Sequence, residues 1–133
     1  LEEEGKGTLG IAYIDVNGLK RVNDTQGHKA GDRLIVSVAD KLFRYLPGGK
    51  VYRTGGDEFI VFCKDISESE FQTMIEHLQS SWDEQSSAAI GYIWMDKIEQ
   101  VESKVSAAEK MMYIGKRKFY ERRGMDRRGD ARR

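Results

Sequence analysis

Apolar positions along this chain follow two different periods, which predict an alternation of strands and helices. Residues 8–16 are almost continuously apolar, as expected of a central strand that is buried on both faces. Residues 87–95 form a second apolar run. Residues 50–54 and 59–63 flank a pair of glycines, which predicts the two strands of a hairpin.

Helical spacing marks the segments between these strands. An amphipathic helix is predicted over residues 32–46, which end at a Pro-Gly-Gly sequence. Its apolar stripe consists of Leu34, Ile35, Val38, Leu42, Phe43 and Leu46. Before it, residues 19–25 predict a short helical turn that Gly27 ends.

Two further helices are predicted in the second half of the chain. The first covers residues 67–82, with Ser67 as its N-cap and Glu70 completing a capping box. The second covers residues 101–121. Its inward-facing residues are Val105, Ala108, Met112 and Phe119.

The order of these elements predicts an α+β fold, in which helices flank a mostly antiparallel central sheet. At 133 residues the chain is long enough for one domain with a real core. We expect that domain to span residues 1–124. Residues 125–133 form a basic tail with too few apolar groups to fold alone.

Composition narrows the possible partners and compartment. Lys+Arg 22 balances Asp+Glu 22, so net charge does not suggest a nucleic-acid or membrane partner. The single Cys63 excludes an internal disulfide, fits a reducing cytoplasm and is predicted to be a buried thiol. No apolar run approaches the roughly 20 residues that span a bilayer. The chain starts at Leu1 rather than Met, so we expect a fragment of a longer protein.

The turn between the hairpin strands carries the first candidate chemistry. Gly55 and Gly56 suit a tight turn, because glycine adopts positive φ without steric cost. Asp57 and Glu58 follow directly, and a turn that only reverses the chain does not need them. Bare backbone beside paired carboxylates suits a nucleoside triphosphate held through a divalent cation. The alternative is a solvated hairpin tip with incidental acids.

A third carboxylate gives this turn a possible purpose. Asp15 ends the first buried strand, where a charge is costly without a partner. If that strand neighbours the hairpin, then Asp15, Asp57 and Glu58 converge at one edge of the sheet. Three carboxylates in one place repel each other, so they imply a cation between them. Oxygen ligands favour Mg²⁺ or Mn²⁺. Alternatively, Asp15 is an N-cap for the segment that follows.

The residues after Asp15 suggest a phosphate and a base. Gly18 allows close approach to the main chain, where the N–H groups of Gly18 and Leu19 can receive a phosphate. Asn23 and Asp32 offer an amide and a carboxylate, which together can recognise the edge of a guanine. Turn formation and helix capping are equally compatible with their spacing.

Together these motifs resemble the GGDEF domain of bacterial diguanylate cyclases. The first matching motif is residues 14–20, the second is residues 53–59, and the similarity resumes in residues 108–116. Between the first two lie Asn23, Asp24, Gly27, His28, Gly31 and Asp32. The resemblance implies a fold related to nucleotidyl cyclases and to the palm of polymerases. It also implies condensation of two GTP molecules into cyclic di-GMP with release of pyrophosphate.

The resemblance assigns the catalytic and metal roles residue by residue. Asp15 and Asp57 would bind Mg²⁺ (or Mn²⁺) with the carbonyl of Val16. Glu58 would be a metal ligand or assist deprotonation of the 3′-hydroxyl.

The substrate roles follow in the same way. Asn23 and Asp32 would recognise guanine, and the backbones of Gly18 and Leu19 would hold phosphate. Gly55 and Gly56 would leave room for the nucleotide, and Lys116 would neutralise its terminal phosphates.

With one GTP in each domain, catalysis requires an antiparallel homodimer. An upstream sensor or receiver domain is expected to control pairing. We expect the domain to lie in the cytoplasm, either in a soluble protein or as the cytoplasmic part of a membrane-anchored sensor.

Three departures from the family pattern stand out. Residues 46–49 replace the Arg-x-x-Asp of the inhibitory product site, so this feedback is expected to be absent. The second basic phosphate ligand after Lys116 is missing from its usual position, and Arg117 or Lys118 is a candidate substitute. The leading segment before the first strand is absent.

Two other functions are alternatives to an active cyclase. One is a non-catalytic GTP-binding module that acts through a partner domain, which the unusual C-terminal helix end and the missing leading segment favour. The other is a metal-dependent nuclease, which shares the acidic cluster but lacks a basic groove outside the tail.

Overall fold

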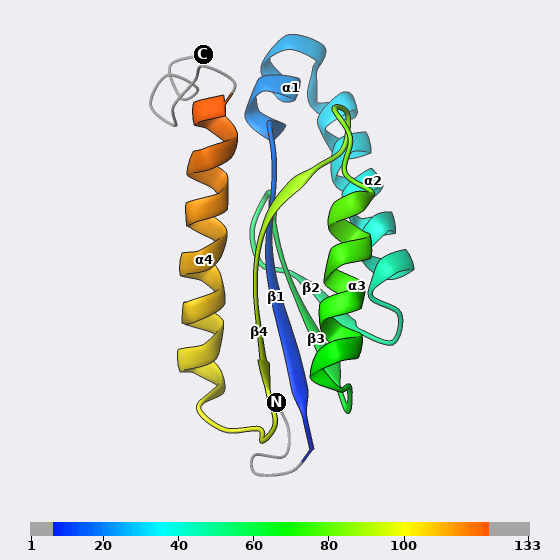
Figure 1. Cartoon of the computed structure of the whole chain (residues 1–133). Coiled ribbons are helices and arrows are strands. Elements are labelled where there is room, and N and C mark those ends of the chain that lie inside the picture. Colours follow the sequence, from blue (N-terminus) through cyan, green and yellow to red (C-terminus); the bar gives the residue numbers. More distant parts are fainter. Residues whose placement is uncertain (1–6, 123–133) are drawn as a thin grey trace.

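The computed structural model describes residues 7–122, which form one four-stranded sheet with helices on both faces (Figure 1). The strands lie in the order β2-β3-β1-β4, and each neighbouring pair is antiparallel. In chain order the elements are β1 (Leu9–Val16), α1 (Leu19–Gln26), α2 (His28–Tyr45), β2 (Lys50–Arg53), β3 (Glu58–Lys64), α3 (Glu68–Ser80), β4 (Ala88–Met95) and α4 (Val101–Arg122). The predicted α+β fold with an antiparallel central sheet is confirmed.

β1 is a central strand, and all eight of its residues are buried. It pairs with β3 on one side and with β4 on the other. The register places Asp15 opposite Glu58 of β3 and Ala89 of β4. The end of β1 therefore lies beside the turn that leads into β3.

Two helical layers explain why the sequence of β1 is apolar without alternation. α2 and α3 cover one face of the sheet, and α4 covers the other (Figure 1). Ala12 and Ile14 of β1 pack into the core beneath α2 and α3, whereas Ile11 and Tyr13 pack into the core beneath α4. Both faces of the strand are thus buried.

The helix that begins after Ser67 is capped as the sequence predicts. The Ser67 hydroxyl accepts a hydrogen bond from the Glu70 N–H at 3.1 Å. The same hydroxyl donates to Glu70 Oε1 at 3.0 Å, so the two side chains of the capping box are joined. Phe71, Ile75 and Leu78 form the buried face of this helix.

The start of α2 was predicted four residues too late. α2 begins at His28, and Gly27 with φ 91° is its N-cap and also the C-cap of α1. The first turn of α2 contains the small buried residues Ala30 and Gly31, which give little apolar signal in the sequence. Consequently, Asp32 lies inside a helix rather than at its beginning.

Two expected core residues are placed differently. Phe43 is 62% exposed, because it lies about 100° around the helix from the buried Leu42. Phe119 is only half-buried, and the neighbouring Tyr120 faces inward instead. The remaining predicted stripe of α2, and Ala108 and Met112 of α4, are buried as expected.

The predicted tail, residues 125–133, lies outside the described part of the chain. Within residues 7–122, no helix has both the length and the apolar character required to cross a membrane.

Cys63 should be chemically inert in the folded protein. Its side chain is buried, and loss of solvent raises the pKa of the thiol to about 11. Because the thiolate is the reactive form, iodoacetamide is expected to alkylate native Cys63 about 100-fold more slowly than the urea-unfolded chain near neutral pH. Mass spectrometry of both reactions over time measures this ratio, and equal rates would contradict the buried placement.

Candidate metal and nucleotide site

Three carboxylates meet where β1 ends and β3 begins. Asp15, Asp57 and Glu58 each offer an oxygen, and these oxygens all lie within 4.8 Å of one another. Asp15 is buried, whereas Asp57 and Glu58 are partly exposed. Their convergence follows from the antiparallel pairing of Asp15 with Glu58. Like charges this close repel one another unless a cation lies among them.

A buried lysine supplies one positive charge. Lys116 Nζ on α4 lies 2.7 Å from Asp15 Oδ1 and 2.7 Å from the carbonyl oxygen of Val16. Lys116 and Asp15 are 4% and 3% exposed, so this is an ion pair largely removed from water. The ring of Tyr120, one helical turn later, lies 5.6 Å from the same ammonium. Lys116 is therefore at the carboxylate cluster.

The electrostatics of Asp15 reflect these opposing neighbours. Burial raises its pKa to about 6, and the negative charges of Asp57 and Glu58 add to this rise, while Lys116 opposes it. Burial and the neighbouring carboxylates thus favour the neutral acid of Asp15. A positive charge at this place stabilises the ionised form instead.

A tyrosine that the sequence did not single out lies between Glu58 and a further carboxylate, Glu109. The Tyr13 hydroxyl donates to Glu58 Oε1 at 3.0 Å and lies 3.4 Å from Glu109 Oε2. Burial and the adjacent carboxylates raise the pKa of Tyr13, which keeps it a donor. Its position two residues before Asp15, on the same face of β1, was the available signal. Glu109 lies two helical turns before Lys116 on α4.

The glycine turn differs from the expected tight hairpin. Neither Gly55 nor Gly56 has positive φ, so the turn does not require glycine for its backbone conformation. Instead, Arg53 donates hydrogen bonds to the carbonyls of both glycines. A Cβ built on Gly56 would meet no atom within 4 Å, so this backbone faces open space beside Asp57.

The start of α1 lies directly after the acidic strand end. Gly18 is the N-cap in a left-handed conformation, with φ 75°, and no side chain caps the helix. The interpretation of Asp15 as an N-cap is therefore wrong. The first N–H groups of α1, from Leu19 onward, have no partners within the helix, which suits an anion.

Asn23 and Asp32 lie on adjoining helices, Asn23 in α1 and Asp32 in α2, so neither is a helix cap. Asn23 Oδ1 lies 1.8 Å from the position that a Cβ on Gly31 would occupy. The amide therefore packs against the backbone immediately before Asp32. Asp32 itself is exposed.

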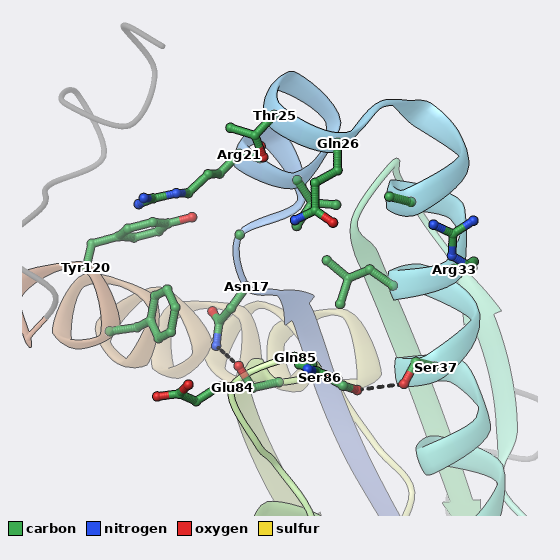
Figure 2. A pocket seen from close by; sticks show the side chains of 16 residues that line it. Asn17, Arg21, Thr25, Gln26, Arg33, Ser37, Glu84, Gln85, Ser86 and Tyr120 are labelled. Carbon is green, nitrogen blue, oxygen red and sulfur yellow. Dashed lines mark hydrogen bonds between the residues drawn. The ribbon is translucent and has the colours of Figure 1, made fainter.

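A cavity of about 850 Å³ lies beside α1 (Figure 2). It is bounded by α1, α2, residues 84–87 and the end of α4. Gly18 lines it, but Asp15, Asp57, Asn23 and Asp32 do not. The cavity thus adjoins the candidate site without containing its carboxylates. Its Asn17 donates to Ser87 Oγ at 2.9 Å.

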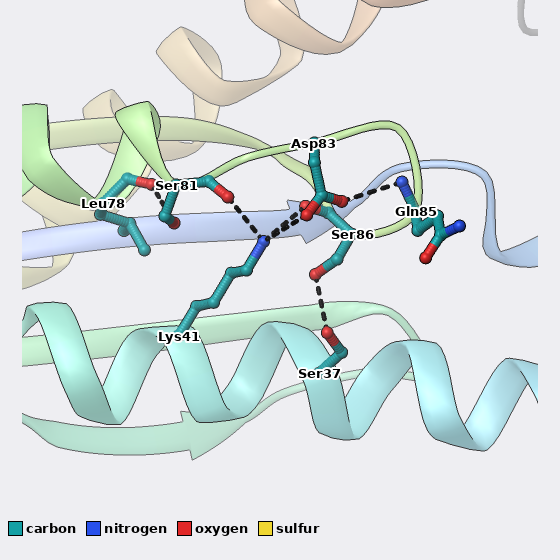
Figure 3. Close-up of polar contacts among 7 residues, drawn as sticks. All are labelled: Ser37, Lys41, Leu78, Ser81, Asp83, Gln85 and Ser86. Atoms are coloured by element: carbon teal, nitrogen blue, oxygen red, sulfur yellow. Dashed lines mark hydrogen bonds and ion pairs between the residues drawn. The ribbon is translucent and has the colours of Figure 1, made fainter.

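One wall of this cavity is fixed by a lysine on α2 (Figure 3). Lys41 Nζ donates to the carbonyls of Ser81 and Ser86 at 2.7 Å and 3.1 Å, and lies 3.5 Å from Asp83 Oδ2. Ser37 Oγ also donates to Ser86 Oγ at 2.9 Å. These contacts tie α2 to the loop before β4, which makes Lys41 a structural residue.

Comparison with known proteins places this arrangement in a family. The family model described as "Diguanylate cyclase, GGDEF domain" matches residues 2–122. An uncharacterized membrane protein of Staphylococcus saprophyticus is 28% identical over 130 residues, which cover 87% of this chain and 36% of that protein. The chain thus spans about a third of the length of this relative.

Solved structures agree with the family match. The GGDEF domain of YfiN from Pseudomonas aeruginosa is 27% identical, with a TM-score of 0.72 over 84% of this chain and 78% of that chain. The coiled coil and GGDEF domain of DgcB from Caulobacter crescentus, in complex with c-di-GMP, is 25% identical, with a TM-score of 0.70 over 84% of this chain and 65% of that chain. The chain therefore belongs to the GGDEF domain family of diguanylate cyclases.

Proposed function

We propose that this domain is an active diguanylate cyclase that condenses two GTP molecules into cyclic di-GMP. The observation that carries the proposal is the convergence of Asp15, Asp57 and Glu58 within 4.8 Å, beside the start of α1 and the buried ammonium of Lys116. These groups provide negative charge for a cation and positive groups for a polyphosphate at one end of β1.

The donor set fits Mg²⁺ or Mn²⁺. Carboxylate and carbonyl oxygens are the ligands that hard divalent ions prefer, and the Lys116 ammonium already acts as a stand-in cation at Asp15 and Val16. Asp15, Asp57 and the Val16 carbonyl would hold the ion, with Glu58 as a further ligand or as the group that accepts the 3′-hydroxyl proton. When bound, the ion supplies charge neutralisation and acidifies the attacking hydroxyl.

The nucleotide would lie from the carboxylates toward α1 and α2. The N–H groups of Gly18 and Leu19 would hold phosphate, and the open backbone at Gly55 and Gly56 would leave room for the nucleotide. Lys116 would neutralise the terminal phosphates. Asn23 and Asp32 would hydrogen-bond to the edge of the guanine.

The reaction needs two domains, because each would present one GTP to the other. We therefore propose an antiparallel homodimer, controlled by an upstream sensor or receiver domain in a longer protein. The related DgcB structure contains a coiled coil, and the cyclase SiaD was solved with its activator SiaC, which supports control by attached or separate partners. The relatives named as membrane proteins support a domain that is part of a membrane-anchored protein.

A non-catalytic GTP-binding module is the second candidate. One observation favours it: the inward-facing residue one turn after Lys116 is Tyr120, an aromatic rather than a basic residue. Arg117 and Lys118, the candidate substitutes, are exposed. Such a module would bind GTP tightly and release no product.

Turnover by a paired form of the domain separates the two candidates. The chain is fused to a dimerising coiled coil and incubated with GTP and Mg²⁺, and cyclic di-GMP is measured by chromatography. Product formation that EDTA abolishes supports the cyclase. A folded dimer that binds GTP without forming product would support the regulatory module.

Gly31→Ala should weaken base recognition without unfolding the domain. The new methyl group would overlap Asn23 Oδ1, and the flexible amide would have to turn away from its present position. Losing about one hydrogen bond to guanine predicts about tenfold weaker binding of a non-hydrolysable GTP analogue. Calorimetry measures this affinity, and Gly115→Ala is the control for adding a methyl group to a helical glycine. Unchanged affinity in a folded Gly31→Ala protein would contradict the role of Asn23.

Metal-dependent stabilisation should decline in mild acid. The pKa of Asp15 is raised to about 6 in the folded state, so protonation near and below this pH removes a metal ligand. The stability of the metal-free protein depends on pH in the opposite direction. The elevated pKa of Asp15 contributes most to the free energy of unfolding at low pH, and this contribution is lost as pH rises through about 6. The rise in melting temperature caused by Mg²⁺ with a GTP analogue should therefore shrink from about pH 7 to about pH 5. A constant rise over that range would contradict this assignment.

A further inference from the structure

The ammonium of Lys116 binds the same two oxygens that the proposed metal needs. Its Nζ lies 2.7 Å from Asp15 Oδ1 and 2.7 Å from the Val16 carbonyl oxygen. A Mg²⁺ ion at the same two oxygens would lie close to the ammonium, because its bonds to oxygen are only roughly 2.1 Å long. The two cations would repel each other, so the ammonium opposes binding of the metal to this pair of oxygens.

The ammonium is well held in the absence of other ligands. Lys116 belongs to the buried face of α4, between Met112 one turn before it and Tyr120 one turn after it. It is only 4% exposed. A metal ion that binds without nucleotide would have to displace the buried ammonium from Asp15. The ammonium would then have no new anionic partner. Because an unpaired buried charge is costly, the ion pair opposes binding of metal alone.

We propose that Lys116 acts as a resident cation that excludes divalent metal from Asp15 and Val16 until a nucleotide polyphosphate offers the ammonium another partner. This inference rests on the proposed function, because it assumes that these oxygens hold the metal during catalysis. Metal and nucleotide then bind cooperatively, and the domain holds little divalent ion without GTP.

The ammonium of Lys116 would have to move only a short distance to exchange Asp15 for a phosphate. The start of α1 at Gly18 is two residues beyond Val16, so a phosphate bound there lies near the lysine. The flexible four-carbon stem of lysine lets the ammonium move while α4 stays in place. The helix itself packs closely on β4 at Gly91, where a Cβ would lie 1.8 Å from the Ala108 carbonyl oxygen.

Binding of Mn²⁺ in the absence of nucleotide tests the proposal. Free Mn²⁺ is measured by electron paramagnetic resonance during titration of the full chain. Two variants remove the ammonium: Lys116→Met, and Lys116→Gln, which keeps a hydrogen-bond donor toward Asp15 should the first variant fold poorly. Lys110→Met is the matched control, because it removes an exposed charge from the same helix.

We expect both Lys116 variants to bind Mn²⁺ about tenfold or more tightly than the wild type and Lys110→Met, a coupling of ordinary size between two ligands. Equal affinities in all four proteins would overturn the proposal. A second measurement separates this failure from that of the proposed function, namely the melting temperature of the wild type with Mn²⁺ and a non-hydrolysable GTP analogue. If the two ligands together stabilise the wild type although Lys116 makes no difference, the metal site stands and the exclusion by Lys116 is wrong. If no protein binds Mn²⁺ with or without the analogue, both proposals fail.

Discussion

Asp57→Asn is expected to lower cyclic di-GMP synthesis by about a thousandfold, the scale of losing a principal electrostatic group in an active site. Asparagine keeps the size of the side chain but removes the negative charge that faces Asp15 and Glu58. The main-chain carbonyl of residue 57 would still accept the hydrogen bond from the Val16 N–H, now 2.8 Å long. The loss should therefore be chemical rather than structural.

The measurement is the turnover of GTP by the dimerised domain, with Asp40→Asn as the matched control. Asp40 is an exposed carboxylate on α2, outside the acidic cluster. Both variants should melt within a few degrees of the wild type, and only Asp57→Asn should be inactive. An Asp57→Asn protein that keeps more than about a tenth of the wild-type rate would exclude a central role for this carboxylate.

Gly91→Ala is expected to destabilise the domain by about 3 kcal/mol or more, at the upper end of overpacking effects. A Cβ at Gly91 would lie 1.8 Å from the Ala108 carbonyl oxygen and 2.5 Å from the Met112 nitrogen. Both atoms belong to the main chain of α4, so no side-chain rotation relieves the overlap. The helix would have to move away from β4 and would take Lys116 with it.

Gly115→Ala provides the control from the same interface. Its Cβ would make an ordinary contact with Ala89 at 3.9 Å, and replacing glycine by alanine within a helix gains up to about 1 kcal/mol. Urea unfolding should thus shift the two variants in opposite directions. Equal stability of Gly91→Ala and the wild type would mean that α4 does not approach β4 as closely as described.

The sequence predicted the fold and the acidic cluster because both depend on local patterns. The uninterrupted apolar run of β1 indicated burial on two faces, which required a central strand. β1 lies beside the hairpin, and the observed antiparallel register pairs Asp15 with Glu58. The start of α2 was missed because Ala30 and Gly31 are buried without being strongly apolar.

The contacts of α4 could not be predicted, since they depend on how a helix lies across the sheet. Lys116 and Asp15 are 101 residues apart in sequence, and no local pattern relates them. The link between Tyr13, Glu58 and Glu109 depends on the same packing. For the glycine turn, the predicted open backbone is confirmed at Gly56, whereas the positive φ expected of the two glycines is absent.

The position of Mn²⁺ in a crystal grown with a non-hydrolysable GTP analogue would show whether the three carboxylates form the metal site. We expect an anomalous peak from an ion bonded to Asp15, Asp57 and the Val16 carbonyl, with phosphate at the start of α1 and guanine at Asn23 and Asp32. Lys116 should then contact phosphate rather than Asp15. A nucleotide bound elsewhere, or an acidic cluster without Mn²⁺ while the analogue is bound, would contradict the account.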